Sequence, residues 1–234
     1  MIWIITGIAL ILRLICLNQS LWLDEAINVL SAKNLDLISF VTKYPIGDYH
    51  PPGYFFLLWV WSHTFGFSEI SVRLPSVFFG VGTVILTYLI GKSLFNKKIG
   101  IIASFLLAVS PLHIYYSQEA RMYSLSTFSV VLFSYFFVRL LNGKKYSFIW
   151  YVLSGILVLY SDYVVYLIFP VHFLFLVLTR RNLLIKWLIA VSASTLFFLP
   201  WINVLMAQIA EGMKAKIALP EWSKVAGGAD LKNI

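Results

Sequence analysis

The sequence predicts an all-α fold: a polytopic membrane protein with about seven transmembrane helices and amphipathic helices in a long first outer loop. Composition is the first observation behind this prediction, since 60% of residues are hydrophobic, 12% are charged and the mean hydropathy is +0.86. Soluble domains are about 45–50% apolar and about 25% charged. The second observation is that charge alternates between successive loops, which is typical of membrane orientation. The net charge of +8 therefore indicates contact with membrane lipids and no nucleic-acid partner.

Seven apolar segments are long enough to be considered as spans, namely residues 1–17, 74–91, 99–116, 122–141, 146–160, 163–178 and 187–206. Most approach the roughly 17–25 residues that a helix needs to cross hydrocarbon. We therefore expect one transmembrane domain over 1–206, and an outer-face loop or truncated C-terminal tail over 207–234. Cys16, the only cysteine, is expected to be a buried thiol in the first span.

Nine of the eighteen basic residues lie in three short loops that contain no acid, namely Lys92, Lys97, Lys98, Arg139, Lys144, Lys145, Arg180, Arg181 and Lys186. All ten acids lie in segments that the span assignment places on the opposite face. Because cytoplasmic loops are enriched in Lys and Arg, the pattern predicts a multi-pass protein of the cytoplasmic (inner) membrane with a cytosolic N-terminus. The same rule places the loop 18–73 outside.

This first outer loop is expected to be ordered. Apolar residues at helical spacing over 24–43 predict one or two short amphipathic helices at the membrane surface, interrupted at 34–36. The aromatic stretch over 54–65 is too short to span comfortably, and its Trp and Tyr content suits the headgroup level.

Asp24 and Glu25 are adjacent acids at the start of this loop, and two interpretations of them stay open. Acids in the first turn of a helix stabilise it by meeting free N–H groups and the positive end of the dipole. Alternatively, a carboxylate at a membrane–water boundary is partly desolvated, so it can serve as a general base toward a hydroxyl or as a metal ligand.

Arg121 lies at the outer end of the fourth apolar helix, where a base contributes nothing to orientation and needs a partner. A carboxylate such as Glu119 or Asp24 would give it a structural role. A lipid phosphate would give it a functional one, because a guanidinium binds phosphate through two donors. Ser117 is expected to be the N-cap of the fourth helix.

His50 and Arg73 are weaker candidates at the same face. Pro51 restricts the backbone of His50, which could contact substrate or an ion. The four histidines include no close His or Cys pair, so no dedicated zinc site is predicted. Arg73 begins the second span and could snorkel to headgroups or bind a substrate phosphate.

Four motifs in order resemble the N-terminal half of the dolichyl-phosphate-mannose–protein mannosyltransferase and aminoarabinose transferase group, which are GT-C superfamily membrane glycosyltransferases. The motifs are Leu21-Trp22-Leu23-Asp24-Glu25-Ala26, His50-Pro51-Pro52-Gly53-Tyr54, Arg73-Leu74-Pro75-Ser76, and Ser110-Pro111-Leu112-His113 with Tyr116-Ser117-Gln118-Glu119-Ala120-Arg121-Met122-Tyr123. Each motif alone is weak, but four in this order with matching topology are specific. The resemblance covers roughly residues 13–205.

The resemblance implies a cell-envelope enzyme that moves a sugar, with inversion, from a polyprenyl-phosphate donor to a protein, lipid or glycan acceptor on the outer face. It implies a catalytic role for Asp24, with Glu25 completing the pair. The segment holding Gln118, Glu119, Arg121 and Tyr123 would contact the donor near its phosphate, with His50 and Arg73 as further substrate-binding residues. Some relatives bind a divalent metal, so a metal stays open, although the resemblance assigns it no ligands here.

Relatives of this kind are usually about twice as long, so a separate C-terminal half is one expected partner. An inactive fragment of such a transferase is therefore an alternative. A different class of function is a non-catalytic polytopic protein, such as a transporter subunit or an assembly partner. A transporter should place ionisable groups within its spans. Here Arg13 is the one strong mid-span charge and the acids gather at one surface, which favours surface chemistry.

Overall fold

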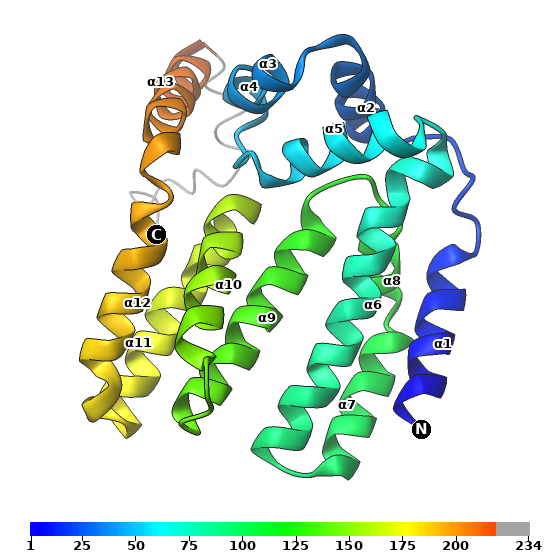
Figure 1. The fold of residues 1–234 in the computed structure, drawn as a ribbon. Coiled ribbons are helices and arrows are strands. Elements are labelled where there is room, and N and C mark those ends of the chain that lie inside the picture. The colour runs from blue at the N-terminus through cyan, green and yellow to red at the C-terminus, as the bar shows by residue number, and fades with distance from the viewer. Residues whose placement is uncertain (219–234) are drawn as a thin grey trace, which may run out of the picture.

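The computed structural model describes residues 1–218, and this part of the chain contains helices and no strand. The predicted all-α class is confirmed. Longer helices run roughly alongside one another as a bundle, and a layer of shorter helices crosses one end of it (Figure 1).

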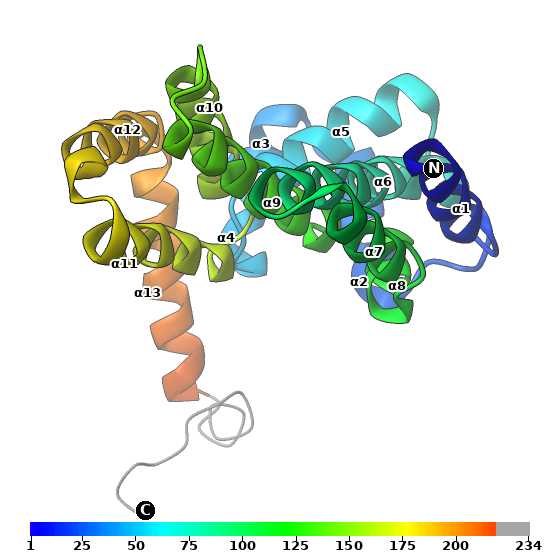
Figure 2. The same cartoon turned by 90° about the horizontal axis from the view of Figure 1, so that it is seen from below.

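The bundle is an elongated row of helices. Its members are α1 (Ile2–Leu14), α6 (Glu69–Leu94), α7 (Lys97–Ala108), α8 (Pro111–Ser117), α9 (Tyr123–Leu141), α10 (Ser147–Ser161), α11 (Ile168–Thr179) and α12 (Leu184–Leu196). Short 3₁₀ turns precede α11 and α12, at Val164–Leu167 and Arg181–Leu183. In the view along the bundle, α1 lies at one side, α11 and α12 lie at the other, and α9 and α10 lie between them (Figure 2).

The helices coincide with the predicted segments, although the number of spans stays a prediction. Two helices, α6 and α9, are long and apolar enough to cross a membrane, and two bent pairs raise the number to four if each pair is one span. The bends are 63° between α7 and α8, and 43° between α12 and the following α13 (Ile202–Ala218). The remaining apolar helices, α1, α10 and α11 with its preceding turn, are shorter than 18 residues.

The break between α7 and α8 follows from proline. Pro111 is the first residue of α8, and Ser110 before it is extended, with ψ of 118°. Proline disfavours the helical region for the preceding residue and donates no backbone hydrogen bond. The predicted N-cap role of Ser117 is wrong. Ser117 ends α8, and α9 begins only at Tyr123.

The outer layer comprises α2 (Leu23–Asn34), α3 (Leu37–Thr42), α4 (Tyr44–Asp48) and α5 (Gly53–Phe65). The sequence predicts one or two short helices over 24–43, and the structure has two, α2 and α3. The predicted break at 34–36 is confirmed, because Asp36 caps α3 by accepting from the Ser39 N–H at 3.0 Å. The sequence reading did not identify α4, which is five residues long.

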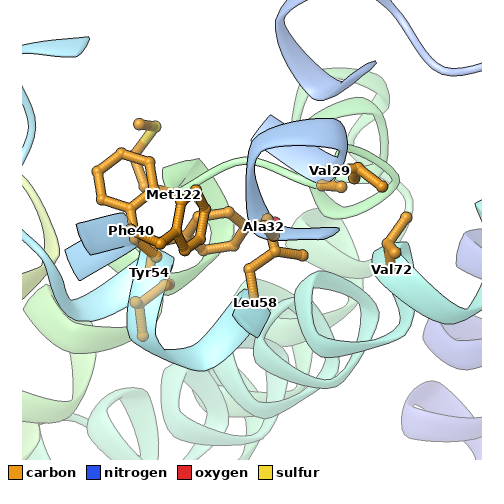
Figure 3. Packing of buried hydrophobic residues seen from close by; sticks show 10 residues of the cluster. Val29, Ala32, Phe40, Tyr54, Leu58, Val72 and Met122 are labelled. Carbon is orange, nitrogen blue, oxygen red and sulfur yellow. The ribbon is translucent and has the colours of Figure 1, made fainter. Parts of the chain in front are cut away.

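A buried apolar cluster joins this layer to the bundle. Val29 and Ala32 of α2, Phe40 of α3 and Leu58 of α5 pack with Met122, which precedes α9 (Figure 3). Burying a large apolar side chain contributes roughly 1.5–3 kcal/mol. The layer is therefore held on the bundle as part of one core.

Among the described residues, the basic loops and the acids lie at opposite ends of the bundle, as predicted, whereas Glu221 and Asp230 lie outside the described residues. The three basic loops, between α6 and α7, α9 and α10, and α11 and α12, lie at the end away from the outer layer, where the N-terminus also lies (Figure 1). Asp24, Asp48 and Glu119 lie at the opposite end, in or beside the layer. The side of the membrane that each end faces stays a prediction.

Helix α1 is fastened by Arg13, whose side chain is fully buried. Its guanidinium donates to the carbonyls of Ala9 and Ala108, at 2.8 and 3.2 Å, and to the Ser117 hydroxyl at 3.2 Å. The expectation that Cys16 is buried in the first span is wrong. α1 ends at Leu14, and Cys16 is exposed with a positive φ of 59°.

Helix α13 returns to the outer layer. The Gln208 side-chain amide donates to the carbonyls of Pro45 at 2.7 Å and His50 at 3.0 Å. α13 runs without a break across the expected domain boundary at 206. Most of the expected tail, residues 219–234, lies outside the described residues.

Candidate active site

Glu25 of the outer layer and Arg73 of α6 form a buried ion pair. Glu25 is 1% exposed and Arg73 5% exposed. Arg73 donates from Nε to Oε1 of Glu25 at 2.9 Å and from Nη2 to Oε2 at 2.6 Å. Its other three bonds reach the carbonyls of Leu17, Gln19 and Ser20. A guanidinium has five N–H donors, so every donor of Arg73 is used within the protein.

The Glu25 carboxylate is saturated as well. Besides the two bonds from Arg73, it accepts from the backbone N–H of Ala120 at 2.6 Å and of Trp22 at 2.8 Å. Burial raises the pKa of Glu25, but the hydrogen bonds from Arg73, Ala120 and Trp22 together outweigh burial and hold the pKa below its ordinary value. Glu25 therefore caps α2 and ties α2 to α6 and to the turn before α9.

Asp24 lies in a contrasting environment although it is the adjacent residue. It is exposed, and its carboxylate makes no hydrogen bond with any residue that the structure describes. Trp22 and Leu23 beside it are 69% and 66% exposed, so the carboxylate lies next to apolar surface. Asp24 is thus free to accept a proton or a ligand, and the neighbouring Glu25 fixes the helix that carries it.

Arg121 lies in the turn between α8 and α9 and is 7% exposed. Its carboxylate partner is Asp48 of α4, at 3.3 Å from Nη1, and Asp48 also pairs with His50 Nδ1 at 2.5 Å. Burial raises the pKa of Asp48, but the His50 hydrogen bond and the Arg121 charge lower it below its ordinary value. Asp48 is a partner that the sequence interpretation did not name.

Most donors of Arg121 have no protein partner among the described residues. Only Nη1 makes a hydrogen bond there, and the buried Nε makes none. Burial lowers the pKa of Arg121, but the charges of the nearby carboxylates, Asp48 first and then Asp24, help to raise it above its ordinary value. The group is therefore a firmly charged cation with unused donors, and the Tyr123 ring lies 5.9 Å from it.

Two more buried polar groups of the outer layer are unpaired within the described part of the chain, namely Asn28 Nδ2 and the Tyr54 hydroxyl, and Tyr54 lies within range of the Arg121 charge. Asn28 Oδ1 accepts from Tyr44 at 2.5 Å. The pKa of Tyr44 is raised to about 12, first by burial and then by the charge of Asp48. Buried polar atoms without partners are rare and require water or a ligand. Each of these groups can donate a hydrogen bond, which suits an anion.

A cleft of about 510 Å³ opens beside the Glu25–Arg73 pair and is also lined by Trp22, Gln118 and Glu119. Burial raises the pKa of Glu119, and although the nearby Tyr115 hydroxyl lowers it, the nearby charge of Glu25 adds to the rise. The pKa of Glu119 stays above its ordinary value. The cleft therefore holds one carboxylate with a depressed pKa and one with an elevated pKa.

The predicted site residues thus divide between two environments. Asp24, Glu119, Arg121 and Tyr123 keep polar groups available. Glu25 and Arg73 use theirs internally, His50 pairs with Asp48, and Gln118 donates to the Ile15 carbonyl at 2.7 Å beyond the end of α1. The sequence did not indicate four further residues of this site, namely Asn28, Tyr44, Asp48 and Tyr54. Tyrosine and asparagine within apolar stretches look like interfacial residues in a sequence, and the Arg121 partner of Asp48 is 73 positions away.

A protein-family model described as dolichyl-phosphate-mannose-protein mannosyltransferase matches residues 49–206. That range is 158 of the 234 residues, which is more than half of the chain. The chain belongs to this family. The resemblance stated from the motifs is confirmed, and the chain is a membrane protein of a glycosyltransferase family.

The residues that the mannosyltransferase family model matches include His50, Arg73 and the segment 118–123. Asp24, Glu25 and Asp48 lie before it, so their roles rest on geometry. Among curated proteins, none matches the chain. Within residues 1–218, no group of three or more His, Cys, Asp and Glu side chains is placed to hold a metal ion. The side chains present in that range therefore do not form a metal-ligand set by themselves.

Proposed function

We propose that this protein transfers a sugar, with inversion, from a polyprenyl-phosphate donor to a protein, lipid or glycan acceptor at the outer face of the cytoplasmic membrane. Family membership supports a membrane glycosyltransferase. The end of the bundle that carries the acids and the outer layer would be the outer face, and the basic end would be cytosolic.

The observation that carries this proposal is the contrast between two buried arginines. Arg73 uses all five donors within the protein, whereas Arg121 uses one among the described residues. Arg121 is therefore the arginine that can bind a phosphate through two parallel donors. The unpaired donors of Asn28 and Tyr54 would complete such an anion site.

In the proposed reaction, the acceptor hydroxyl lies against Asp24. The hydroxyl oxygen attacks the anomeric carbon, and its proton passes to the Asp24 carboxylate. The bond between that carbon and the phosphate oxygen breaks, and the electron pair leaves with polyprenyl phosphate. The buried Arg121 would stabilise the charge that develops on the phosphate, and electrostatic stabilisation of this kind is usually the largest single contribution to catalysis.

Glu25 supports this reaction from a distance. Its four hydrogen bonds leave no lone pair for an acceptor, and its depressed pKa makes it a poor base. It would position α2, and with it Asp24. We therefore assign Asp24 as the base and Glu25 as a positioning residue.

The test is reconstitution of the 234-residue chain into liposomes with a panel of polyprenyl-phosphate sugars. Donor binding and release of polyprenyl phosphate are measured separately. We expect binding of at least one donor, and binding should weaken in Arg121→Met. Release should additionally require Asp24. A protein that binds no member of the panel would contradict the proposal and favour a non-catalytic membrane role.

A further inference from the structure

A second polar hollow lies at the basic end of the bundle, away from the candidate active site. It has a volume of about 490 Å³, within the roughly 300–1,000 Å³ of ligand sites. Three bases line it, namely Lys92 of α6, Arg139 of α9 and Lys144 of the loop after α9, and Leu89, Ser93 and Tyr135 line it as well. Both ribbon views show α6 and α9 side by side (Figures 1 and 2).

The convergence of three bases here is more than orientation requires. Cytosolic orientation needs bases in loops, but it does not need them to share a hollow. Six of the nine bases in the three basic loops do not line it, and no acid is among its lining residues. Three cations without a counter-charge in one hollow repel one another, so an anion bound among them would be stabilised.

Arg139 is held ready for such a ligand. Its Nη1 donates to the Tyr135 hydroxyl at 3.2 Å, and the guanidinium lies 5.8 Å from the Tyr135 ring. This is the one hydrogen bond of the Arg139 side chain with the described residues, so its other donors are available. Because the Tyr135 oxygen accepts this bond, its own hydrogen can be donated to an anion. The hydroxyl of Ser93 adds another donor.

We propose that this hollow binds the phosphate of an anionic phospholipid from the surrounding leaflet. α6 is long and apolar enough to span a membrane, and the hollow lies beside its last turns, where a spanning helix would reach the lipid headgroups. Leu89, one turn inside Lys92, provides apolar surface for the start of an acyl chain. Basic hollows between membrane helices are sites of this kind. The site is independent of the sugar transfer proposed for the other end.

The experiment uses the full chain in detergent, titrated with short-chain phosphatidylglycerol, short-chain phosphatidylcholine or inorganic phosphate, with bound ligand counted by native mass spectrometry. Lys92→Gln/Lys144→Gln should bind phosphatidylglycerol roughly 10- to 30-fold more weakly, because the variant loses the attraction of two bases to an anionic lipid. Lys97→Gln/Lys98→Gln is the matched control, because it removes two bases from the same end that do not line the hollow. The control should bind normally.

A second matched pair adds charge instead of removing it. Ser93→Asp places a carboxylate in the hollow, whereas Asn96→Asp adds the same charge to the loop after α6 and keeps an acceptor for the Ile99 N–H that Asn96 now caps. Only Ser93→Asp should weaken phosphatidylglycerol binding. Equal losses in test and control variants, or equal binding of the two lipids, would overturn the proposal. Displacement of the lipid by equimolar inorganic phosphate would show that the hollow prefers free phosphate, and it would contradict the proposal that a phospholipid is the ligand.

Discussion

Glu25 of α2 and Arg73 of α6, 48 residues apart, form a buried two-fold ion pair, with Nη2–Oε2 at 2.6 Å and Nε–Oε1 at 2.9 Å. The pair fastens the first helix of the outer layer to the longest helix of the bundle. Because Asp24 is the next residue, the same contact sets where the free carboxylate lies. The ion pair at Glu25 therefore positions the proposed base Asp24, which is the adjacent residue.

Glu25→Gln should destabilise the protein strongly. Removing one partner of a buried ion pair leaves the other charge uncompensated and costs about 3–5 kcal/mol. Thermal unfolding in detergent measures the effect, and Asp24→Asn is the control because it neutralises the adjacent exposed acid. Equal unfolding temperatures for the two variants would show that the Glu25–Arg73 pair does not fasten the layer.

Asp24→Asn should abolish transfer and leave stability nearly unchanged. Loss of a general base lowers the rate by about 10²–10⁴-fold, whereas an exposed carboxylate without hydrogen bonds contributes little to folding. Release of polyprenyl phosphate is the measurement. Asp36→Asn, a conservative change at the N-cap of α3, is the matched control and should retain activity. Full activity in Asp24→Asn would remove Asp24 as the base.

Arg121→Lys should weaken donor binding although the charge is kept. Lysine cannot present the two parallel donors with which a guanidinium binds phosphate, so we expect a loss on the order of tenfold or more. A cycle with Asp48→Asn separates the two roles of Arg121. Coupling in stability alone, with normal donor affinity in Arg121→Met, would leave Arg121 as a structural partner of Asp48.

Glu119 should make stability fall as pH rises. Its pKa is raised above the ordinary value of 4.5, chiefly by burial, so the folded state retains a proton that the unfolded state has lost. Stability is full below the unfolded pKa and is lost as pH rises through the folded pKa. Glu119→Gln should therefore raise the unfolding temperature at pH 7 and change it little at pH 4.

Glu25 has the opposite sign, which provides an internal check on the pH experiment. Its pKa is lowered, so its contribution is present above the unfolded pKa and is lost as pH falls through the folded value. The wild type should therefore lose this contribution in acid. The difference in unfolding temperature between the wild type and Glu25→Gln should be smaller at pH 4 than at pH 7. An equal difference in unfolding temperature at pH 7 and pH 4 would contradict the assigned pKa direction.

Labelling of single cysteines should report the proposed orientation. In a Cys16→Ser background, Asn96→Cys, Gly143→Cys and Asn182→Cys should react only from the cytosolic side, whereas Asn34→Cys should react from outside. Cys16 must be replaced because it is exposed. Labelling of any of the three basic loops from outside would overturn the orientation.

The sequence by itself determined the helical class, the positions of the apolar segments, the sorting of charge to two ends and the family. These properties follow from composition, periodicity and motif order, which are local or additive along the chain. The break at 34–36 belongs with them, because Asp36 caps α3 through a residue only three positions away.

Only the tertiary structure decided which charged groups are used. Asp24 and Glu25 are adjacent acids, yet one is exposed and the other accepts four hydrogen bonds from residues between 3 and 95 positions away. Arg73 and Arg121 are both buried arginines near one face, yet among residues 1–218 only Arg73 finds a partner for every donor. Sequence patterns cannot distinguish them, because the availability of a polar group depends on partners that distant segments bring to it.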